Sequence, residues 1–331
     1  MIRRFLFNCL PLALIASIGC APESTTQTTE TADAYPSRAA TIVCPWAAGG
    51  GTDRVSRILA DLFKEHYGQP FVVQNRTGGS GAVGHSAGAL ASPDGYTISM
   101  ITFELSTMHW MGITDLTYRN FEPVIQVNAD AAAILVNKDS PFKTIAELLD
   151  HVRKNPGKTT LSGTATGGAW DLARAGFLLA AGLPVDSVRW IPSKGSAPSI
   201  VELLGGHVDA ICCSAPEAAA QLESGELRAL TVMADERLAE FPDIPTCKES
   251  GIDWSAVGWR GLALPKGTPP DIVKSLESKA LEIVKSEAFK GFMKKNGFAI
   301  VIRDSAAFST FLEAQEAQWK TVVEATGYSK Q

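Results

Sequence analysis

A glycine-rich loop between a short apolar run and an amphipathic segment constrains the fold of this chain more than any other feature. The apolar residues 41–44 predict a buried strand, and the three glycines at 49–51 allow a tight turn with positive φ. Threonine and aspartate at 52–53 are common N-cap residues, and apolar side chains recur at helical spacing over 55–63. Backbone N–H groups at such a helix start bind anions. The stretch therefore predicts either an anion site or only a tight turn between strand and helix.

The same alternation of short apolar runs and helical periods continues along the chain. Loops rich in glycine, serine and threonine follow expected strands at 78–84, 162–168 and 193–199. Alternating strands and helices predict an α/β fold with mainly parallel sheets, in which ligands bind at the carboxyl ends of strands. Together with the loop at 46–53, these loops suggest two lobes that share one cleft. We expect the other strands near 71–75, 96–103, 134–137, 159–162, 188–191, 210–213, 229–233 and 259–264. We expect a helix that the glycines of 78–84 open and that runs through Leu90, and further helices near 144–152, 198–204, 217–223 and within 270–325.

The N-terminal residues predict export. The chain opens with basic residues, and the apolar stretch 5–18 is too short to span a bilayer as a mature helix. The sequence Ser17-Ile-Gly-Cys20 resembles a bacterial lipoprotein cleavage box, although Ser17 stands where that box usually has leucine. We expect a signal peptide over 1–19, a lipid anchor on Cys20 and a flexible polar tether over 20–35. The alternative is an ordinary signal peptide with an incidental Cys20, and either way the protein is periplasmic or at the cell surface.

Charge and the spacing of cysteine and histidine argue against a nucleic-acid partner and against a metal site. The formal net charge is −5, and no cluster of lysine and arginine suggests a nucleic-acid face. Cys44, Cys212, Cys213 and Cys247 belong to the folded body, and the sequence leaves their disulfide state open. The chain has no CxxC motif or Cys/His spacing, and its five histidines are scattered. We therefore expect no metal and no cofactor.

A series of short motifs follows one another over most of the chain. They are Tyr35-Pro-Ser37, Pro45-Trp-Ala-Ala-Gly-Gly-Gly-Thr-Asp53, Val73-Gln-Asn-Arg76, Gly78-Gly-Ser-Gly81, Ser92-Pro-Asp-Gly-Tyr-Thr97, Ser193-Lys-Gly-Ser-Ala-Pro198, Leu203-Leu-Gly-Gly206, Leu227-Arg-Ala-Leu230, Phe241-Pro-Asp-Ile-Pro-Thr246 and Leu264-Pro-Lys-Gly-Thr-Pro269. In order and spacing they resemble the extracytoplasmic receptors of the tripartite tricarboxylate transporter family, of TctC or Bug type.

This resemblance implies a two-lobed type II periplasmic-binding-protein fold, with each lobe a mainly parallel sheet flanked by helices and the ligand cleft between the lobes. Lobe I would comprise 36–134 and 258–331, and lobe II 135–257, with the chain crossing near 134–137 and 258–262. The resemblance also implies a receptor, not an enzyme, that binds a small di- or tricarboxylate or a related acid. Its implied partners are one large and one small membrane subunit of the transporter, and we expect the receptor itself to be a monomer.

Residues suited to hold a carboxylate lie in the four loops and beside them. Hydroxyls and backbone N–H groups donate hydrogen bonds to carboxylate oxygens, whereas Trp46 would either stack on the ligand or pack under its loop. Many family members carry histidine where this chain has Asp171, and a carboxylate there repels an anionic ligand unless it caps the helix or binds a polar group. The candidate ligand-binding residues are Trp46, Ala47, Gly50, Gly51, Thr52, Asp53, Ser80, Gly81, Ser106, Thr107, Thr164, Thr166, Gly167, Trp170, Asp171 and Ser196.

An NAD(P)-dependent oxidoreductase is the alternative interpretation. Gly79-Ser-Gly-Ala-Val-Gly84 fits the GxGxxG pattern after a strand, and Glu104 follows at the distance of a ribose-binding acid. The export signal argues against it, because nicotinamide pools are cytoplasmic, and the motif lies in the second strand–helix unit instead of the first. A hydrolase is weaker still, since Ala82 replaces the last glycine of a GxSxG motif around Ser80.

Overall fold

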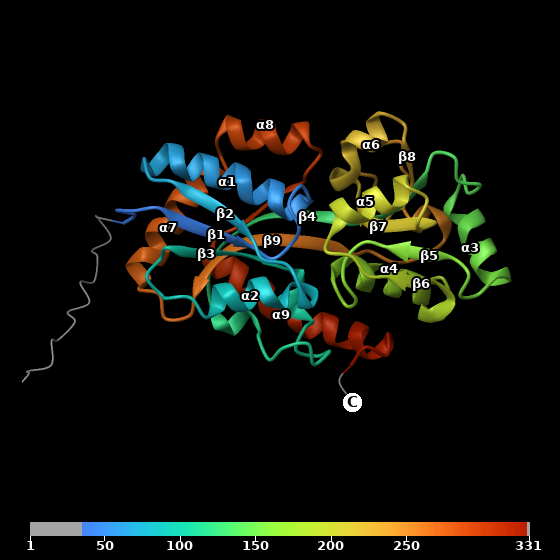
Figure 1. Ribbon diagram of the computed structural model, residues 1–331, viewed down its shortest axis with the longest axis horizontal. Helices are drawn as coiled ribbons and strands as arrows, with labels where there is room; N and C mark the ends of the chain where they lie inside the picture. Colours follow the sequence, from blue (N-terminus) through green and yellow to red (C-terminus); the bar gives the residue numbers. More distant parts are fainter. Residues whose placement is uncertain (1–34, 330–331) are drawn as a thin grey trace, which may run out of the picture. The chain divides into compact units, whose positions relative to one another are not determined.

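The computed structural model describes residues 35–329, so the predicted signal peptide and Cys20 lie outside the described residues. Within this range strands and helices alternate along the chain (Figure 1). No helix of this range is both long and apolar enough to cross a membrane. The strands are β1 (Ala40–Cys44), β2 (Phe71–Asn75), β3 (Thr97–Thr102), β4 (Phe121–Asn137), β5 (Thr160–Ser162), β6 (Arg189–Ile191), β7 (Ala210–Ser214), β8 (Leu227–Val232), β9 (Val257–Pro265) and β10 (Ile300–Arg303). The α-helices are α1 (Gly51–Tyr67), α2 (Ala82–Ala89), α3 (Ile145–Lys154), α4 (Ala169–Ala180), α5 (Ser196–Leu204), α6 (Ala219–Glu223), α7 (Pro270–Ile283), α8 (Glu287–Lys295) and α9 (Ser305–Ala325).

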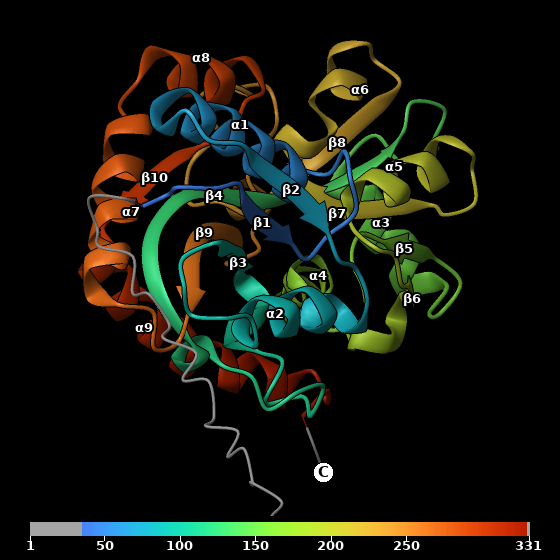
Figure 2. The same cartoon turned by 60° about the vertical axis from the view of Figure 1, so that its left-hand side comes forward.

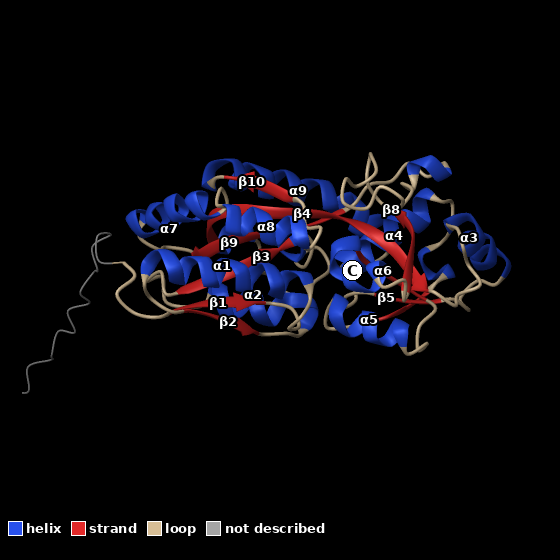
Figure 3. Cartoon of the chain, turned by 90° about the horizontal axis from the view of Figure 1, so that it is seen from above, coloured by secondary structure: helices blue, strands red, loops and turns tan. Residues whose placement is uncertain are grey.

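Two long antiparallel strands, β4 and β9, join two sets of parallel strands. β1 runs parallel to β2 and β3, and β5 runs parallel to β6 and β7. β4 pairs with β9 as far as Ala131 and with β7 from Ala132 onward. Figure 3 shows β4 beside β9. It is therefore shared between sheet A (β1, β2, β3, β9, β10 and the first part of β4) and sheet B (β5 to β8 and the rest of β4). Residues 134–137, where the sequence predicts a crossing between lobes, lie inside sheet B, and the lobe boundaries remain a prediction.

The fold is a two-lobed α/β architecture built on a curled sheet with helices on both faces. In Figure 1, α1 and α8 lie on one side of sheet A and α2 and α9 on the other, while α5 and α4 lie on opposite sides of sheet B. Figure 2 shows the curvature of β4. The predicted fold class is confirmed, and the expected parallel pairing is found within each set of outer strands. The antiparallel β4 and β9 make the complete sheet mixed.

The sequence pattern missed the first half of β4 and all of β10. Gln126, Asn128 and Asp130 are buried in β4 and interrupt the apolar run that marks a central strand. β10 has only four residues and pairs with β4 at the edge of sheet A. The start of α3 was easier to predict, because its signal is local. The expected capping box of Thr144 and Glu147 opens α3, and α7, α8 and α9 occupy the C-terminal third as expected.

Helices and sheets pack together around two apolar cores. α1 contributes Leu59 and Phe63 to a core on sheet A, and α4 contributes Leu172 and Phe177 to a second core that covers sheet B and continues onto sheet A. Burial of such side chains from water is the main favourable term in folding. The cysteines of the described residues are buried free thiols: Cys44, Cys212, Cys213 and Cys247.

The glycine loop before α1 differs from its predicted form. α1 begins at Gly51, and its N-cap is Gly50, so the predicted N-cap role of Thr52 and Asp53 is wrong. Among the three glycines only Gly49 has a positive φ, of 82°. Gly50 has an extended backbone with φ −73° and ψ 171°, which any residue can adopt. Its lack of a side chain therefore matters for space and not for backbone conformation.

Asp53 closes this loop from inside the helix. Its carboxylate accepts hydrogen bonds from Gly49 N at 2.9 Å, from Arg57 Nε at 2.9 Å and from Asn75 Nδ2 at 2.9 Å. Burial disfavours the charged form of Asp53, but these hydrogen bonds, that from Arg57 most of all, outweigh burial and hold its pKa below the usual value. The charged carboxylate thus ties the loop, α1 and β2 together.

We predict that Asp53→Asn lowers the free energy of unfolding at pH 7 by about 1–2 kcal/mol, because a neutral amide replaces a charged acceptor. A lowered pKa stabilises the fold above the pKa of the unfolded state, about 3.9, and this contribution is lost as the pH falls through the folded value. Urea unfolding at pH 7 and pH 3 should therefore show the difference between wild type and variant shrinking at pH 3. Asp61→Asn, on the exposed part of α1, is the control and should stay within about 0.5 kcal/mol of wild type at both pH values. A difference that is equally large at pH 3 would contradict this role.

Candidate functional site

A cavity of about 30 Å³ lies where loops from sheets A and B meet. β1 and β3 lead into it from sheet A, and the loops after β5 and β6 reach it from sheet B. Half of the predicted ligand-binding residues line it: Trp46, Ala47, Gly50, Gly51, Thr52, Thr164, Trp170 and Ser196. The rest of its lining comprises Thr102, Phe103, Glu104, Ala169, Gly195, Glu217, Gly258, Trp259 and Arg260.

Three helices begin beside this cavity with glycine as the N-cap. Gly50 precedes α1, Gly168 precedes α4 and Gly195 precedes α5, and none of these N-caps supplies a side-chain hydrogen bond. The first N–H groups of each helix are left for another acceptor, and the helix dipoles add positive potential. The starts of α1 and α5 face each other, since a Cβ on Gly50 would lie 3.3 Å from Ser196 Oγ and 4.0 Å from Ala197 N. This geometry favours an anion between α1 and α5.

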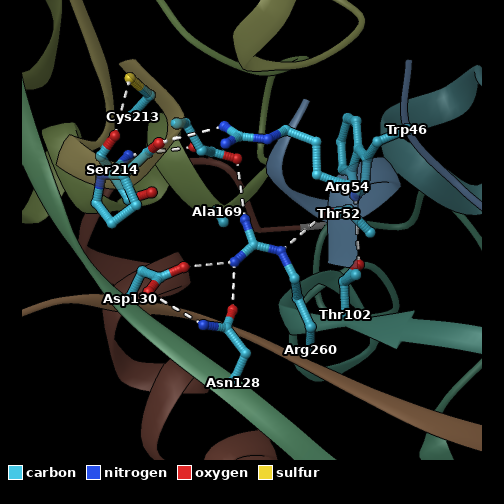
Figure 4. Close-up of polar contacts among 12 residues, drawn as sticks. Trp46, Thr52, Arg54, Thr102, Asn128, Asp130, Ala169, Cys213, Ser214 and Arg260 are labelled. Carbon is cyan, nitrogen blue, oxygen red and sulfur yellow. Dashed lines mark hydrogen bonds and ion pairs between the residues drawn. The ribbon is translucent and has the colours of Figure 1, made fainter. Parts of the chain in front are cut away.

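A buried arginine forms the wall of the cavity between the two sheets. Arg260 of β9 is 3% exposed and makes ion pairs with Asp130 of β4 (Nη1–Oδ2 2.7 Å) and Glu217 (Nη2–Oε1 2.9 Å). Its Nε donates to Thr52 Oγ1 of α1 at 3.0 Å, and its Nη1 also donates to Asn128 (Figure 4). Each guanidinium nitrogen thus has a partner within the protein. Arg260 fixes the cavity wall and does not offer an unpaired charge to a ligand.

Glu104 is a second buried acid in the cavity wall, in the short 3₁₀ helix Phe103–Ser106 after β3. Its Oε1 accepts a hydrogen bond from Ala169 N, the first residue of α4, at 2.9 Å. Its Oε2 accepts from Thr102 Oγ1 at 2.5 Å, and Trp46 Nε1 donates to the same Thr102 oxygen at 3.4 Å. Burial raises the pKa of Glu104, although these two hydrogen bonds act in the opposite direction. Glu104 therefore links the end of β3 in sheet A to a helix of sheet B.

Two other predicted residues line a neighbouring cavity. Ser80 and Gly81 border a space of about 240 Å³ together with Trp46 and Lys194. Trp46 borders both cavities. Ser80 Oγ donates to the carbonyl oxygen of Thr166 at 2.7 Å, which joins the loop before α2 to the loop before α4.

The carboxylate of Asp171 is paired with groups of the protein itself. It is fully buried, its Oδ2 accepts from Gly167 N at 2.9 Å, and its Oδ1 forms an ion pair with Arg174. Its carboxylate is therefore bound to its own loop and helix, which fits the capping alternative that the sequence left open. The predicted residues that line neither cavity are Asp53, Ser106, Thr107, Thr166, Gly167 and Asp171. Their ligand contact remains a prediction, as does that of the residues that line the cavities.

Sequence reasoning missed the charged part of the cavity wall. Arg260 lies within an apolar strand and Glu217 in a segment that the sequence marks only as helical. Glu104 entered only the dinucleotide interpretation, as a ribose ligand, yet it accepts from Ala169 N. A buried charge inside an apolar run was the one available signal for Arg260, because such a charge needs partners.

The comparisons with known proteins agree with this architecture. The model of the family described as "Tripartite tricarboxylate transporter family receptor" matches residues 55–328. Protein BugT of Bordetella pertussis is 31% identical over 301 residues, which cover 89% of this chain and 91% of BugT. The structure of the periplasmic binding protein BugD has 32% identity and a TM-score of 0.84, covering 90% of this chain and 100% of BugD. A protein of R. palustris solved with adipate has 29% identity and a TM-score of 0.81, covering 88% of this chain and 98% of that protein. The chain therefore belongs to the tripartite tricarboxylate transporter family of receptors.

Proposed function

We propose that this protein captures a small organic carboxylate between its lobes and delivers it to a transporter made of one large and one small membrane subunit. The observation that carries the proposal is the meeting of α1 and α5: the first residues of both helices line one cavity, and their glycine N-caps provide no side-chain hydrogen bond to the helix starts. A carboxylate would satisfy these groups and the two helix dipoles at once. The structural relative solved with adipate supports the same ligand class.

The family is one of extracytoplasmic solute receptors and not of enzymes, which excludes the oxidoreductase and hydrolase alternatives. The glycines at 79–84 line a cavity of 240 Å³ only in part, and Glu104, the ribose ligand in that alternative, is buried against α4. The action of the protein is therefore binding and release.

Ligand entry requires movement of the lobes. The cavity of about 30 Å³ is smaller than a carboxylate of several carbons and offers room for little more than a water molecule or two. β4 pairs with strands of both sheets, and its Asp130 forms an ion pair with Arg260 of the neighbouring β9 in the cavity wall. We infer that the lobes open about these strands and that ligand contacts from both sides favour the closed state.

A thermal-shift screen with mono-, di- and tricarboxylates tests the proposed function, with NADH as a control. A ligand present at 100 times its dissociation constant stabilises a protein by about 2.7 kcal/mol. Stabilisation by at least one carboxylate supports the proposal. Stabilisation by NADH alone would contradict it.

We predict that Gly50→Val weakens carboxylate binding by at least about tenfold, or 1.4 kcal/mol. The extended backbone of Gly50 accepts valine without strain, but the new Cβ would lie 3.3 Å from Ser196 Oγ, where we expect the ligand. Calorimetry on folded protein measures the loss. Gly291→Ala is the matched control, because a Cβ at Gly291 meets no atom within 4 Å. Full affinity in Gly50→Val would remove the start of α1 from the binding site.

Small-angle scattering tests the lobe motion. Saturating carboxylate should reduce the radius of gyration of the wild-type protein, because the closed state contacts the ligand from both sides. An unchanged radius at saturation would mean that the ligand enters a preformed site without closure.

We also propose that Cys20 carries a lipid anchor, on the basis of Ser17-Ile-Gly-Cys20 at the end of the apolar stretch. Cys20→Ala should abolish labelling with fatty acid and move the protein to the soluble periplasmic fraction. A wild-type protein that takes no fatty-acid label would overturn the anchor and leave the receptor function in place.

A further inference from the structure

The strand β8 lies at the edge of sheet B, with β4 as its neighbour in the sheet. Within the described chain, backbone hydrogen bonds cover the other side of β8 only at its last residue. There Val232 N donates to the carbonyl oxygen of Pro245 at 2.9 Å, and Val232 O accepts from Cys247 N at 2.9 Å. An uncovered edge presents free N–H and C=O groups to another chain. Residues 227–230 are therefore open to pairing with a further strand.

The hydrogen bonds to β4 show which backbone groups face this open edge. In an antiparallel pair, alternate residues bond to the partner strand, and the residues between them point to the other side. Lys138 N donates to the carbonyl oxygen of Glu226 at 3.0 Å, so the bonded set continues at Arg228. Leu227 and Ala229 then direct their N–H and C=O groups away from β4. No other group of the described chain bonds to them.

A groove of about 880 Å³ lies along the open edge, lined by residues 227–230, the start of α3, α6 and the segment 240–245. α6 lies beside β8 (Figure 1). Ligand pockets in proteins measure roughly 300–1,000 Å³, so the groove can hold several residues of an extended chain. Apolar side chains form part of its wall: Ile145, Leu222, Leu227, Leu230, Phe241 and Ile244.

Positive charge predominates in this groove. Arg228 belongs to the open edge, and its guanidinium reaches only carbonyl oxygens of the described chain, those of Phe142 at 3.5 Å and of Lys138 at 3.4 Å. No basic residue of the lining forms an ion pair with another described residue, so these charges are available to an incoming acidic group. The basic residues of the lining are Lys138, Lys143, Arg228, Lys294 and Lys295, and its acidic residues are Glu223, Glu240 and Asp243.

These charges decide which kind of strand the edge accepts. Two copies of the protein that paired β8 with β8 would bring Arg228 and Lys138 of one copy near those of the other, and like charges on paired strands are destabilising. An acidic strand instead accepts charge-assisted hydrogen bonds from the same side chains. Successive side chains of a strand point to opposite faces, so apolar residues at every second position could contact the apolar wall.

We propose that the open edge of β8 is a docking site for an extended acidic segment of a partner protein, which joins sheet B as a further strand. The backbone of that segment pairs with Leu227 and Ala229, its acidic side chains contact the basic residues of the groove, and its apolar side chains contact the groove wall. The groove shares no lining residue with the carboxylate cavity. The docking site is therefore independent of the proposed carboxylate binding.

Fluorescence anisotropy with labelled octapeptides tests this proposal. One peptide alternates valine with glutamate, and the other alternates valine with lysine. We expect the glutamate peptide to bind wild-type protein at least about tenfold more tightly than the lysine peptide, because the unpaired cations of the groove attract one and repel the other. Equal affinities, or no binding by the glutamate peptide, would overturn the docking site and leave carboxylate binding untouched.

Backbone pairing is tested first on the protein. Ala229→Pro removes an N–H that faces the groove and keeps the ladder to β4, since proline is found on edge strands where its nitrogen points outward. The folded variant should bind the glutamate peptide at least about tenfold more weakly than wild type. Ala229→Ser keeps the N–H and should bind like wild type. Circular dichroism establishes that each variant is folded, and full affinity in folded Ala229→Pro would refute the pairing.

The peptide supplies a second test of pairing that needs no variant. N-methylation of all its glutamates removes the N–H groups on one edge of the strand, and N-methylation of all its valines removes those on the other. At least one of these peptides should bind wild-type protein at least about tenfold more weakly than the parent peptide. Unchanged binding by both would exclude an added strand, whether or not Ala229→Pro folds.

Two further measurements identify the charges and the occupant. Lys138→Gln combined with Arg228→Gln should weaken binding of the glutamate peptide at least about tenfold, whereas Lys274→Gln, on the exposed part of α7, should not. The chain's own segment 21–34 has three acidic residues and no basic one, so it serves as another labelled peptide. We expect it to bind more weakly than the glutamate peptide, because it lacks large apolar side chains. Tighter binding by this segment would make a second copy of the chain the occupant and overturn the partner protein.

Discussion

The buried guanidinium of Arg260 is the interaction on which the arrangement of the cavity depends. Its partners come from β4, α1 and the segment before α6, so one side chain joins both sheets and the helix that begins at the glycine loop. A buried charge is tolerated only when all of its hydrogen-bonding groups are satisfied. The need to satisfy Arg260 therefore fixes Asp130 and Glu217 relative to Thr52, and with them the start of α1.

Beside this wall, three helices begin with a glycine N-cap that provides no side-chain hydrogen bond to the helix start. Serine or aspartate at an N-cap position would satisfy the first N–H groups of its own helix and stabilise it by about 1 kcal/mol. Gly50 and Gly195 do not do so, and the chain gives up that stabilisation where α1 and α5 meet. The start of α4 differs, because the carboxylate of Glu104, which follows β3 of sheet A, accepts the hydrogen bond of Ala169 N that a local cap would otherwise accept. The three helix starts are chemically alike, yet they present different surfaces to a ligand.

The sequence predicted what local signals determine. The strands before the glycine loops, the capping box of α3 and eight of the seventeen residues that line the cavity follow from periodicity and turn residues near one another in the chain. The resemblance to the receptor family gave the two-lobed class. The exact N-cap of α1 was wrong by two or three residues, because glycine can take that position without any side-chain signal.

Contacts between distant segments escaped the sequence analysis. Arg260 meets Asp130 and Thr52 only after β9, β4 and α1 have assembled, and no local pattern encodes that meeting. The first half of β4 was missed for the same reason, since its buried polar residues make sense only as partners of Arg260 and Arg303. Glu104 looked like a ligand of a dinucleotide because its spacing was judged without knowledge of α4.

The sharing of β4 between the two sheets has a consequence for how the protein comes apart. Sheet B loses a central strand if residues 121–131 leave sheet A and draw the rest of β4 with them, and the converse also holds. The apolar core that covers sheet B also includes Phe308, Leu312 and Trp319 of α9. This C-terminal helix follows all strands of sheet B in the sequence. The two lobes are therefore not independent folding units. Heat or denaturant should unfold both lobes in one cooperative transition. A protease that cuts α9 should also destabilise sheet B, although the strands of that sheet lie far from α9 in the sequence.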